Sequence, residues 1–244
     1  YISVTGVQTC ALPISSNQTI TPTATPTIQR FSPFNPATIP PASYSTYFNG
    51  STDYLSIASN AALNVGSGDY TMEAWIYMTS LAANMTVFSG TATGATVWGI
   101  SSSGGSIQIN AYGTGPVNGT TGATQSYSFS ANVWYHIATT RASGSTRMFV
   151  NGTLIGSATN DPNTYVQTGM TIGNAGSSQF FPGYISNLRV VKGTALYTST
   201  FTPPTAPLAA VANTVLLTCQ SPMFADNSSN NLTITASSNT VKPT

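Results

Sequence analysis

The sequence predicts an all-β fold, a two-sheet antiparallel sandwich of the jelly-roll type. From Tyr44 onward, short runs rich in β-branched and aromatic residues alternate with turns of Gly, Asn, Ser and Asp. No segment combines about ten residues of helical periodicity with capping residues at its ends. The 244 residues, 41% of them hydrophobic, are enough to bury an ample core between two sheets. Many short strands with regular turns therefore favour a sandwich.

Two segments precede the predicted sandwich. Residues 1–14 lack the basic residues and the continuous apolar stretch of a secretory signal, and they are too short and too polar to span a membrane. Residues 4–14, VTGVQTCALPI, resemble a translated sequencing-library adapter on an assembled metagenomic fragment, so we exclude residues 1–14 and Cys10 from the fold. A disordered N-terminal tail is the alternative. Residues 15–43 repeat Thr-Pro and Pro-Pro, which predicts an extended linker.

An internal similarity points to a tandem repeat. Residues 15–21, SSNQTIT, resemble residues 228–235, SSNNLTIT, and Thr27-Ile28 is matched by Thr240-Val241. The first pair of segments begins 213 residues apart (228 − 15), as does the second pair (240 − 27), and a gap of one residue makes the offset 214 between Thr19 and Thr233 (233 − 19). We expect residues 15–21 to end a preceding module, although chance similarity in Ser/Thr/Asn-rich sequence is the alternative. The expected organisation is then a sandwich at 44–236 and a linker at 237–244 toward a following module.

The clearest strand is DYTMEAWIYM at residues 69–78. Its even-numbered residues from Met72 to Met78 are apolar and predict the core face, whereas Glu73, Trp75 and Tyr77 share the other face. Further strands are expected within residues 106–112, 134–141, 170–176, 180–191 and 213–221.

A β-hairpin is predicted in RMFVNGTLIGS, residues 147–157. Asn-Gly is the favoured pair for a type I′ turn, because both residues tolerate positive φ. With Asn151-Gly152 as the turn, Val150 lies opposite Thr153 and Phe149 opposite Leu154.

Composition excludes several classes of function. Only 5% of the residues are charged and the net charge is +1, so the six Lys and Arg residues cannot neutralise a run of phosphates in nucleic acid. Cys219 is the one cysteine left after the exclusion and His136 is the single histidine, which rules out an internal disulfide, a cysteine zinc site and a histidine cluster. A surface polar through hydroxyls and amides is typical of virion or extracellular proteins.

Five segments resemble the laminin-G-like, concanavalin A-like lectin/glucanase superfamily in order and spacing: YFNGSTDYLSI (47–57), DYTMEAWIY (69–77), WYHIATTR (134–141), MFVNGTLIG (148–156) and FFPGYISNLRVVKGTALYTSTF (180–201). The resemblance implies a concanavalin A-like jelly roll with one curved sheet. It also implies carbohydrate or protein ligands on the concave face or the loop rim, with calcium in some members and glycosidase activity in others.

A narrower resemblance comes from FSPF before the sandwich and FTPPTAPLAAVANTVLLTCQS after it. Both are similar to a subgroup of marine phage structural proteins, in which such modules occur in tandem on long virion proteins. This similarity independently favours the repeat.

Glycoside hydrolysis usually needs two carboxyl groups, about 5–5.5 Å or about 6.5–9.5 Å apart. The glucanase branch carries alternate acids on one strand, whereas here Glu73 is followed by Trp75 and Tyr77. Asp69 lies on the same face but about 13 Å away at the rise of a strand. His136 lies in the middle of a strand and is expected to be structural. We therefore predict a non-enzymatic protein, and a hydrolase with a partner acid from a distant loop is an alternative.

A structural calcium ion is a candidate cofactor, because hard cations take several oxygen ligands. Asp53, in the turn NGSTDYL, occupies a position that is often acidic in the superfamily, and Asp226 with Asn227 precedes a C-terminal strand that commonly returns beside the first strand. The alternative is that Asp53 and Asp226 cap turns through their own hydrogen bonds.

Aromatic rings are candidate platforms for sugars, since a pyranose presents an apolar face and hydroxyls. The sequence offers Trp75, Tyr77, Trp98 and Tyr112 as platforms, Asn110 as a polar partner and Tyr165 as a ring at the rim. Tryptophan in a sandwich strand is more often part of the core, to which we assign Trp134. The run VVKGTALYTSTFTPP is expected to wrap the outer edge with Arg189 and Lys192 solvated, and Cys219 to be a small buried residue.

The predicted function is a lectin-like recognition module of a repetitive virion or extracellular protein. Its expected partners are cell-surface glycans, bound weakly by each module and more strongly by several linked modules. Other virion proteins are further candidate partners. The alternative is a purely architectural module that spaces or decorates a virion tail.

Overall fold

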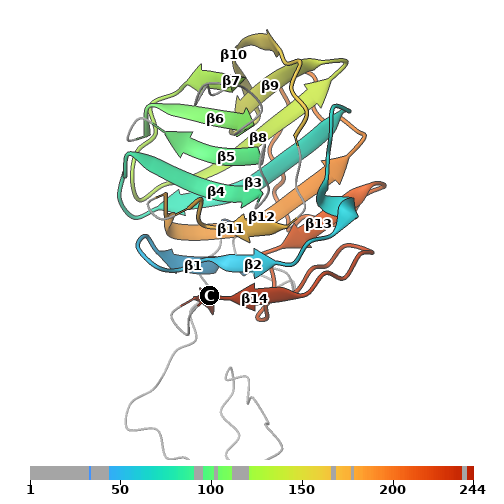
Figure 1. Cartoon of the computed structure of the whole chain (residues 1–244). Coiled ribbons are helices and arrows are strands. Elements are labelled where there is room, and N and C mark those ends of the chain that lie inside the picture. Colours follow the sequence, from blue (N-terminus) through green and yellow to red (C-terminus); the bar gives the residue numbers. More distant parts are fainter. Residues whose placement is uncertain are drawn as a thin grey trace, which may run out of the picture.

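The computed structural model describes residue 33 and residues 44–90, 96–101, 104–111, 121–165, 169–176, 179–237 and 241–244. These residues form two antiparallel sheets packed face to face (Figure 1). The predicted fold class is therefore confirmed. Within the described residues the helical content is one short turn, η1 (Ala61–Leu63), and no helix there has the length and apolar character needed to cross a membrane.

Sheet A has eight strands. Their spatial order is β10 (Thr153–Asn160), β9 (Ser145–Val150), β8 (Trp134–Ala142), β3 (Tyr70–Met78), β12 (Pro182–Lys192), β1 (Thr46–Asn49) and β15 (Lys242–Pro243), and β13 (Thr214–Thr218) also pairs with β12. Since β12 is long, β1 pairs with its first half and β13 with its second half.

Sheet B has seven strands. Their spatial order is β14 (Ile234–Ala236), β2 (Leu55–Ile57), β11 (Met170–Ile172), β4 (Asn84–Gly90), β5 (Thr96–Ser101), β6 (Ser106–Ala111) and β7 (Thr121–Ser126). Gln125 of β7 donates hydrogen bonds to Ser157 and Thr159 of β10, so the two sheets also meet along this side.

The core lies between the sheets, and β3 follows the predicted alternation. Met72, Ala74, Ile76 and Met78 are all fully buried there, while Glu73, Trp75 and Tyr77 lie on the opposite face, the outer face of sheet A. The alternation of a strand thus assigns this face correctly from sequence.

The predicted hairpin is confirmed in its register. Thr153 pairs with Val150 and Leu154 with Phe149 across β9 and β10. Asn151 and Gly152 have φ values of 48° and 75°, as a type I′ turn requires. Gly152 is also needed for space, because a Cβ atom there would lie 2.0 Å from the carbonyl oxygen of Phe201.

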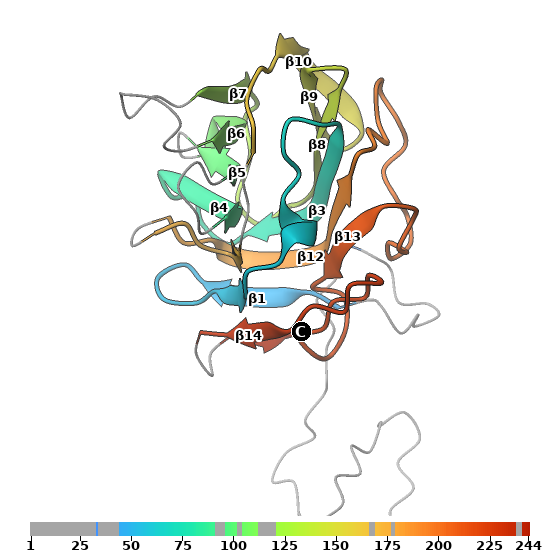
Figure 2. The same cartoon turned by 45° about the vertical axis from the view of Figure 1, so that its right-hand side comes forward.

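Residues 193–213, which we call the strap, cover part of the outer face of sheet A. In Figure 2 this chain between β12 and β13 runs along the outer side of the sheet. Leu196 N–H donates to Thr71 Oγ1 at 2.8 Å, Thr140 Oγ1 donates to the Tyr197 carbonyl at 2.7 Å, and Phe201 N–H donates to the Gly152 carbonyl at 2.9 Å. The strap is therefore joined to β3, β8 and the hairpin turn.

The sandwich continues beyond residue 236, where the sequence predicted a linker. Val241 is 4% exposed within the core, and β15 pairs with β1. Ser45 and Thr244 exchange two backbone hydrogen bonds of 2.8 and 2.7 Å. The boundary predicted at residue 236 is thus too early, because the last strand closes one edge of sheet A.

Candidate functional site

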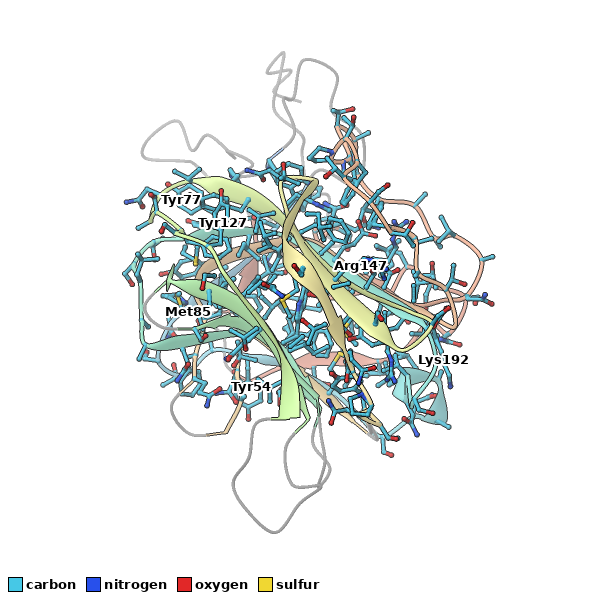
Figure 3. All side chains as sticks on the ribbon, turned by 90° about the horizontal axis from the view of Figure 1, so that it is seen from above. Tyr54, Tyr77, Met85, Tyr127, Arg147 and Lys192 are labelled. Carbon is cyan, nitrogen blue, oxygen red and sulfur yellow. The ribbon has the colours of Figure 1, made fainter. Side chains whose placement is uncertain are left out.

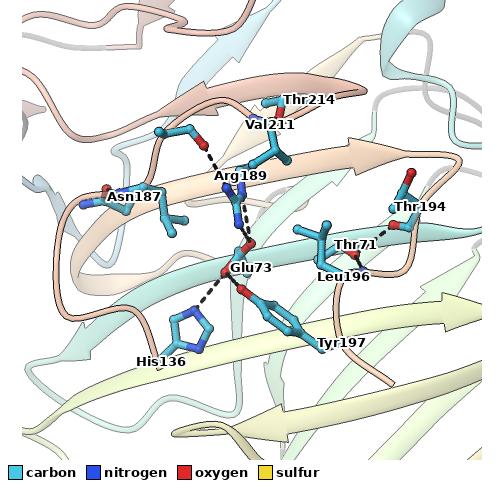
Figure 4. Close-up of polar contacts among 12 residues, drawn as sticks. Thr71, Glu73, His136, Asn187, Arg189, Thr194, Leu196, Tyr197, Val211 and Thr214 are labelled. Carbon is cyan, nitrogen blue, oxygen red and sulfur yellow. Dashed lines mark hydrogen bonds and ion pairs between the residues drawn. The ribbon is translucent and has the colours of Figure 1, made fainter. Parts of the chain in front are cut away.

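Glu73 is the centre of a buried polar network on the outer face of sheet A (Figure 4). Arg189 donates to Glu73 Oε1 through Nε at 2.9 Å and also through a terminal nitrogen. His136 Nε2 donates to Glu73 Oε2 at 3.1 Å, and the Tyr197 hydroxyl donates to the same oxygen at 2.9 Å. Glu73 and His136 are 0% exposed and Arg189 is 5% exposed. The expectation that Arg189 is solvated is therefore wrong.

The charge of Glu73 is maintained by its neighbours. Burial raises the pKa of its carboxyl group, but the hydrogen bond from His136 and the charge of Arg189 outweigh burial, so the pKa is below its usual value. Burial and then the Glu73 carboxylate raise the pKa of Tyr197, so its phenol stays protonated and donates. The network is an ion pair with two further donors, and the strap supplies Tyr197 to it.

This network is not arranged as a pair of catalytic carboxyl groups. Within the described residues, the hydrogen-bond partners of Glu73 are Arg189, His136 and Tyr197, and none is a carboxyl group. Asp69 is engaged elsewhere, accepting from the Ser143 N–H at 2.9 Å. Ring contacts with Phe201 and Trp75 at 5.7 and 5.3 Å also enclose His136. The geometry therefore makes Glu73 an anchor for the strap.

Two of the predicted calcium ligands, Asp53 and Asp226, accept hydrogen bonds from backbone N–H groups. Asp226 accepts four hydrogen bonds, from the N–H groups of Leu217, Ser228 and Leu232 and from the Ser228 hydroxyl, at 2.8–3.0 Å. Asn227 is exposed and donates its N–H to the Leu217 carbonyl.

Asp53 is 0% exposed and accepts from the Asn49 N–H at 3.2 Å. Across the described parts of the chain, no cluster of three or more His, Cys, Asp or Glu residues is placed to hold a metal. Since both oxygens of Asp226 already accept hydrogen bonds from protein donors, Asp226 does not fit a calcium ion. The alternative of turn capping fits Asp53 and Asp226.

Two of the predicted sugar platforms are core residues. Trp98 is 0% exposed and donates its Nε1–H to Thr139 Oγ1 at 2.8 Å across the core. Tyr165 is 0% exposed and donates to Asp161 Oδ2 at 2.7 Å, so its predicted position at the rim is wrong. Asn110 belongs to β6, but its side chain lies outside the described structure, as does the whole of Tyr112.

Trp75 and Tyr77 are half-buried on the outer face of sheet A, as their predicted role requires. In the structure three further aromatic residues line up with Tyr77 on the outer face of sheet A. In cross-strand register, Trp134 of β8 pairs with Tyr77 of β3, Tyr77 with Tyr184 of β12, and Tyr184 with Tyr47 of β1. We call these four residues the aromatic ladder, and all four are half-buried.

The assignment of Trp134 to the core is wrong. Tyr135 and Ile137 take the core positions of β8, so Trp134 and His136 lie on the outer face. The sequence WYHIATTR already indicated this. Its most apolar residue, Ile137, is three positions from Trp134, and residues an odd number of positions apart in a strand lie on opposite faces. No local sequence pattern could predict that β8, β3, β12 and β1, which are distant in sequence, bring these four aromatic residues side by side.

Comparison with known proteins identifies the family. A laminin G family model, described as the concanavalin A-like lectin/glucanases superfamily, matches residues 49–197. The chain belongs to this superfamily. A search of curated proteins found no match.

Solved structures of the concanavalin A-like fold are similar to this chain. A candidate carbohydrate-binding protein from Bacteroides ovatus has a TM-score of 0.61 at 18% identity, over 82% of this chain and 60% of that chain. This chain therefore spans less than two thirds of that protein. The CBM40 module of the Ruminococcus gnavus IT-sialidase, bound to α2,3-sialyllactose, has a TM-score of 0.51 at 12% identity, over 63% of this chain and 91% of that chain. At these identities the likeness establishes the shared fold.

In this member of the concanavalin A-like superfamily, the outer face of sheet A is thus divided in two. The strap seals the charged half around Glu73, whereas the aromatic half is partly exposed. Figure 3 labels Tyr77 on one side of the molecule and Arg147 and Lys192 on another. The exposed aromatic half offers apolar faces and phenol hydroxyls, which suit a ligand that is both polar and ring-shaped.

Proposed function

We propose that this protein is a non-catalytic carbohydrate-recognition module that binds cell-surface glycans weakly. The observation that carries the proposal is the partly exposed aromatic surface of sheet A, which includes Trp75 and Tyr77. Aromatic rings pack against the apolar faces of sugars, and phenol and amide groups exchange hydrogen bonds with their hydroxyls.

The comparisons support this proposal through the fold. The Bacteroides ovatus protein is described as a candidate carbohydrate-binding protein, and the CBM40 module is bound to α2,3-sialyllactose; both share this sandwich. Because a fold hosts several functions, the aromatic surface has to carry the argument for this chain.

The non-catalytic part of the proposal rests on Glu73. A general acid or nucleophile needs access to the glycosidic bond and a second carboxyl group at a suitable distance. Glu73 is fully buried and its oxygens accept from Arg189, His136 and Tyr197.

We further propose that the module belongs to a repetitive virion or other extracellular protein. The support is the similarity of residues 15–28 to residues 228–241, together with the low charge of the chain. In such an array each weak contact raises the effective concentration of the next, so the array binds more tightly than one module.

A glycan array probed with the full chain tests the proposed function, with release of reducing sugar followed on every glycan that binds. Binding without release is the expected result. An array with no binding on any glycan would favour the architectural alternative, and release of reducing sugar would favour a hydrolase.

A further inference from the structure

We propose that the aromatic ladder of Trp134, Tyr77, Tyr184 and Tyr47 is a binding site for a single extended chain of neutral sugars. The chain would lie across β8, β3, β12 and β1. This inference rests on the proposed function and adds the place of binding and the class of glycan.

The spacing of the ladder suits a polymer of sugar rings. Adjacent strands lie about 4.8 Å apart, and one ring projects from each of four adjacent strands. The ring centroids are 5.5 Å apart for Trp134 and Tyr77, 5.9 Å for Tyr77 and Tyr184, and 5.0 Å for Tyr184 and Tyr47. The four rings thus form one continuous row across the strands, so an extended oligosaccharide lying along the row would contact several of them.

The tilt of the rings favours a single polysaccharide chain as the ligand over the flat surface of a crystalline polysaccharide. Neighbouring planes meet at 55°, 78° and 53° along the ladder. Because the four ring planes are tilted, they do not make one flat platform for a flat ligand surface; they offer faces and edges in turn. A single flexible chain can follow such a surface.

Polar groups lie beside the rings, as sugar hydroxyls require. The Tyr77 hydroxyl lies 3.5 Å from Asn132 Oδ1, and Asn132 is exposed. Burial, and then the neighbouring Tyr47 and Tyr77, raise the pKa of Tyr184, so its phenol is a neutral hydrogen-bonding group at physiological pH. The ladder thus combines apolar faces with uncharged donors and acceptors.

The cations whose side chains the structure describes favour a neutral sugar over an acidic one. Recognition of a sugar carboxylate is strongest with Arg or Lys beside it. Among the described side chains, Arg141 and Arg189 are buried, at 4% and 5% exposure. Arg147 and Lys192 are partly exposed, but Figure 3 shows both well away from Tyr77. None of these four cations is therefore placed to bind a sialic acid on the ladder. The sialyllactose titration tests the remaining neighbour, Lys242, whose backbone pairs with Tyr47 at the end of the ladder.

Calorimetric titration of the full chain tests the site. The probes are cellohexaose, laminarihexaose and maltohexaose, their disaccharides, lactose and 3′-sialyllactose. The variants are Trp134→Leu and Tyr184→Leu, which keep apolar bulk but remove the flat ring.

Tyr54→Leu is the matched control, because Tyr54 is also half-buried and Figure 3 places it far from Tyr77. Near-ultraviolet circular dichroism of each variant shows whether it is folded.

We expect at least one hexaose to bind more tightly than its disaccharide, with about tenfold weaker binding by each ladder variant and unchanged binding by the control. We also expect sialyllactose to bind no more tightly than lactose. A glycan that binds equally to the wild type and both ladder variants would overturn the site but leave the proposed function standing. Ladder-dependent preference for sialyllactose would overturn the neutral class.

Two further outcomes would also contradict the inference. If sedimentation shows a dimer that Trp134→Leu dissociates, then a second copy occupies the ladder. If neither the titrations nor the glycan array detect any carbohydrate, then the proposed function fails together with the site.

Discussion

Arg189 and Glu73 are directly paired across β12 and β3, and Arg189 Nε donates to Glu73 Oε1 at 2.9 Å inside the protein. The pairing depends on a β-bulge between Ser186 and Arg189, where Asn187 has a φ of 53°. Up to Ser186 the even residues of β12 face outward, and after the bulge the odd residues do. The bulge thus turns Arg189 to the face that carries Glu73.

Breaking this ion pair is expected to destabilise the protein strongly. Arg189→Met leaves a buried carboxylate without its cation, and we expect a loss of about 3–5 kcal/mol in the free energy of unfolding, measured by urea denaturation. The double variant Glu73→Leu/Arg189→Met is the control, since it removes both charges. The single variant Glu73→Leu completes the cycle. If the double variant loses as much free energy of unfolding as Arg189→Met and Glu73→Leu together, the two side chains are not coupled.

The network also predicts acid sensitivity. In the unfolded chain the Glu73 carboxyl has its ordinary pKa of about 4.3, and in the folded protein its pKa is lower. The unfolded state therefore binds the proton more readily, so the stabilisation is complete above about pH 4.3 and is lost as the pH falls through the folded value.

Thermal melts between pH 6 and pH 3 test this prediction. The wild type is expected to lose more stability over this range than Glu73→Gln, whose side chain does not titrate. Parallel profiles for the two proteins would contradict the assignment to Glu73.

Substitution of Trp98 is expected to lower stability and spare glycan binding, whereas substitution of Trp134 is expected mainly to weaken glycan binding. Trp98→Phe removes the hydrogen bond to Thr139 and core volume, so it should cost about 1–3 kcal/mol in stability and leave glycan affinity unchanged. Trp134→Leu should weaken glycan binding with a smaller loss of stability, because Trp134 is half-buried. Chemical denaturation and the titrations above measure both quantities, and a loss of affinity in Trp98→Phe would contradict the division.

Asp226 is expected to stabilise the protein without calcium. Asp226→Ala leaves the buried N–H groups of Leu217 and Ser228 without their acceptor, which should cost about 3 kcal/mol. Asn227→Ala is the neighbouring control and should change stability by less than about 0.5 kcal/mol, because Asn227 is exposed. The melting temperature of the wild type should be equal in excess calcium and in chelator. A rise of several degrees with calcium would indicate a bound ion.

If the proposed repeat is real, residues 15–28 should be able to replace residues 228–241 in the sandwich. Four of the positions at which residues 15–28 match residues 228–241 contact the rest of the sandwich. Ser228 donates to Asp226 at 2.8 Å and Asn230 donates to the Val215 carbonyl at 2.9 Å. Ile234 and Val241 are 8% and 4% exposed in the core. The corresponding residues are Ser15, Asn17, Ile20 and Ile28.

We therefore expect a chimera with residues 15–28 in place of residues 228–241 to fold cooperatively. A second chimera that carries the same residues in scrambled order is the control and should unfold at a lower temperature. Equal melting temperatures for the two chimeras would indicate that the similarity is compositional.

Much of this fold could be predicted from sequence, because its signals are local. The alternation of Met72 to Met78 assigned the core face of β3, and Asn151-Gly152 determined the turn and register of its hairpin. Turn chemistry and strand periodicity act over a few residues, so they can be recognised without knowing what lies opposite.

The candidate site depended on pairing between distant strands. Trp98 and Trp134 both lie in strands, but only the packing of sheet A on sheet B decides that one is core and the other outer face. The ladder takes its rings from residues 47, 77, 134 and 184, which no local pattern connects. Arg189 was expected to be solvated, but Glu73 of β3 and the Ala209 carbonyl of the strap accept its hydrogen bonds and bury it. The sequence by itself thus determined the strands, while the tertiary structure decided which side chains meet, since contacts across a sheet depend on register and not on distance along the chain.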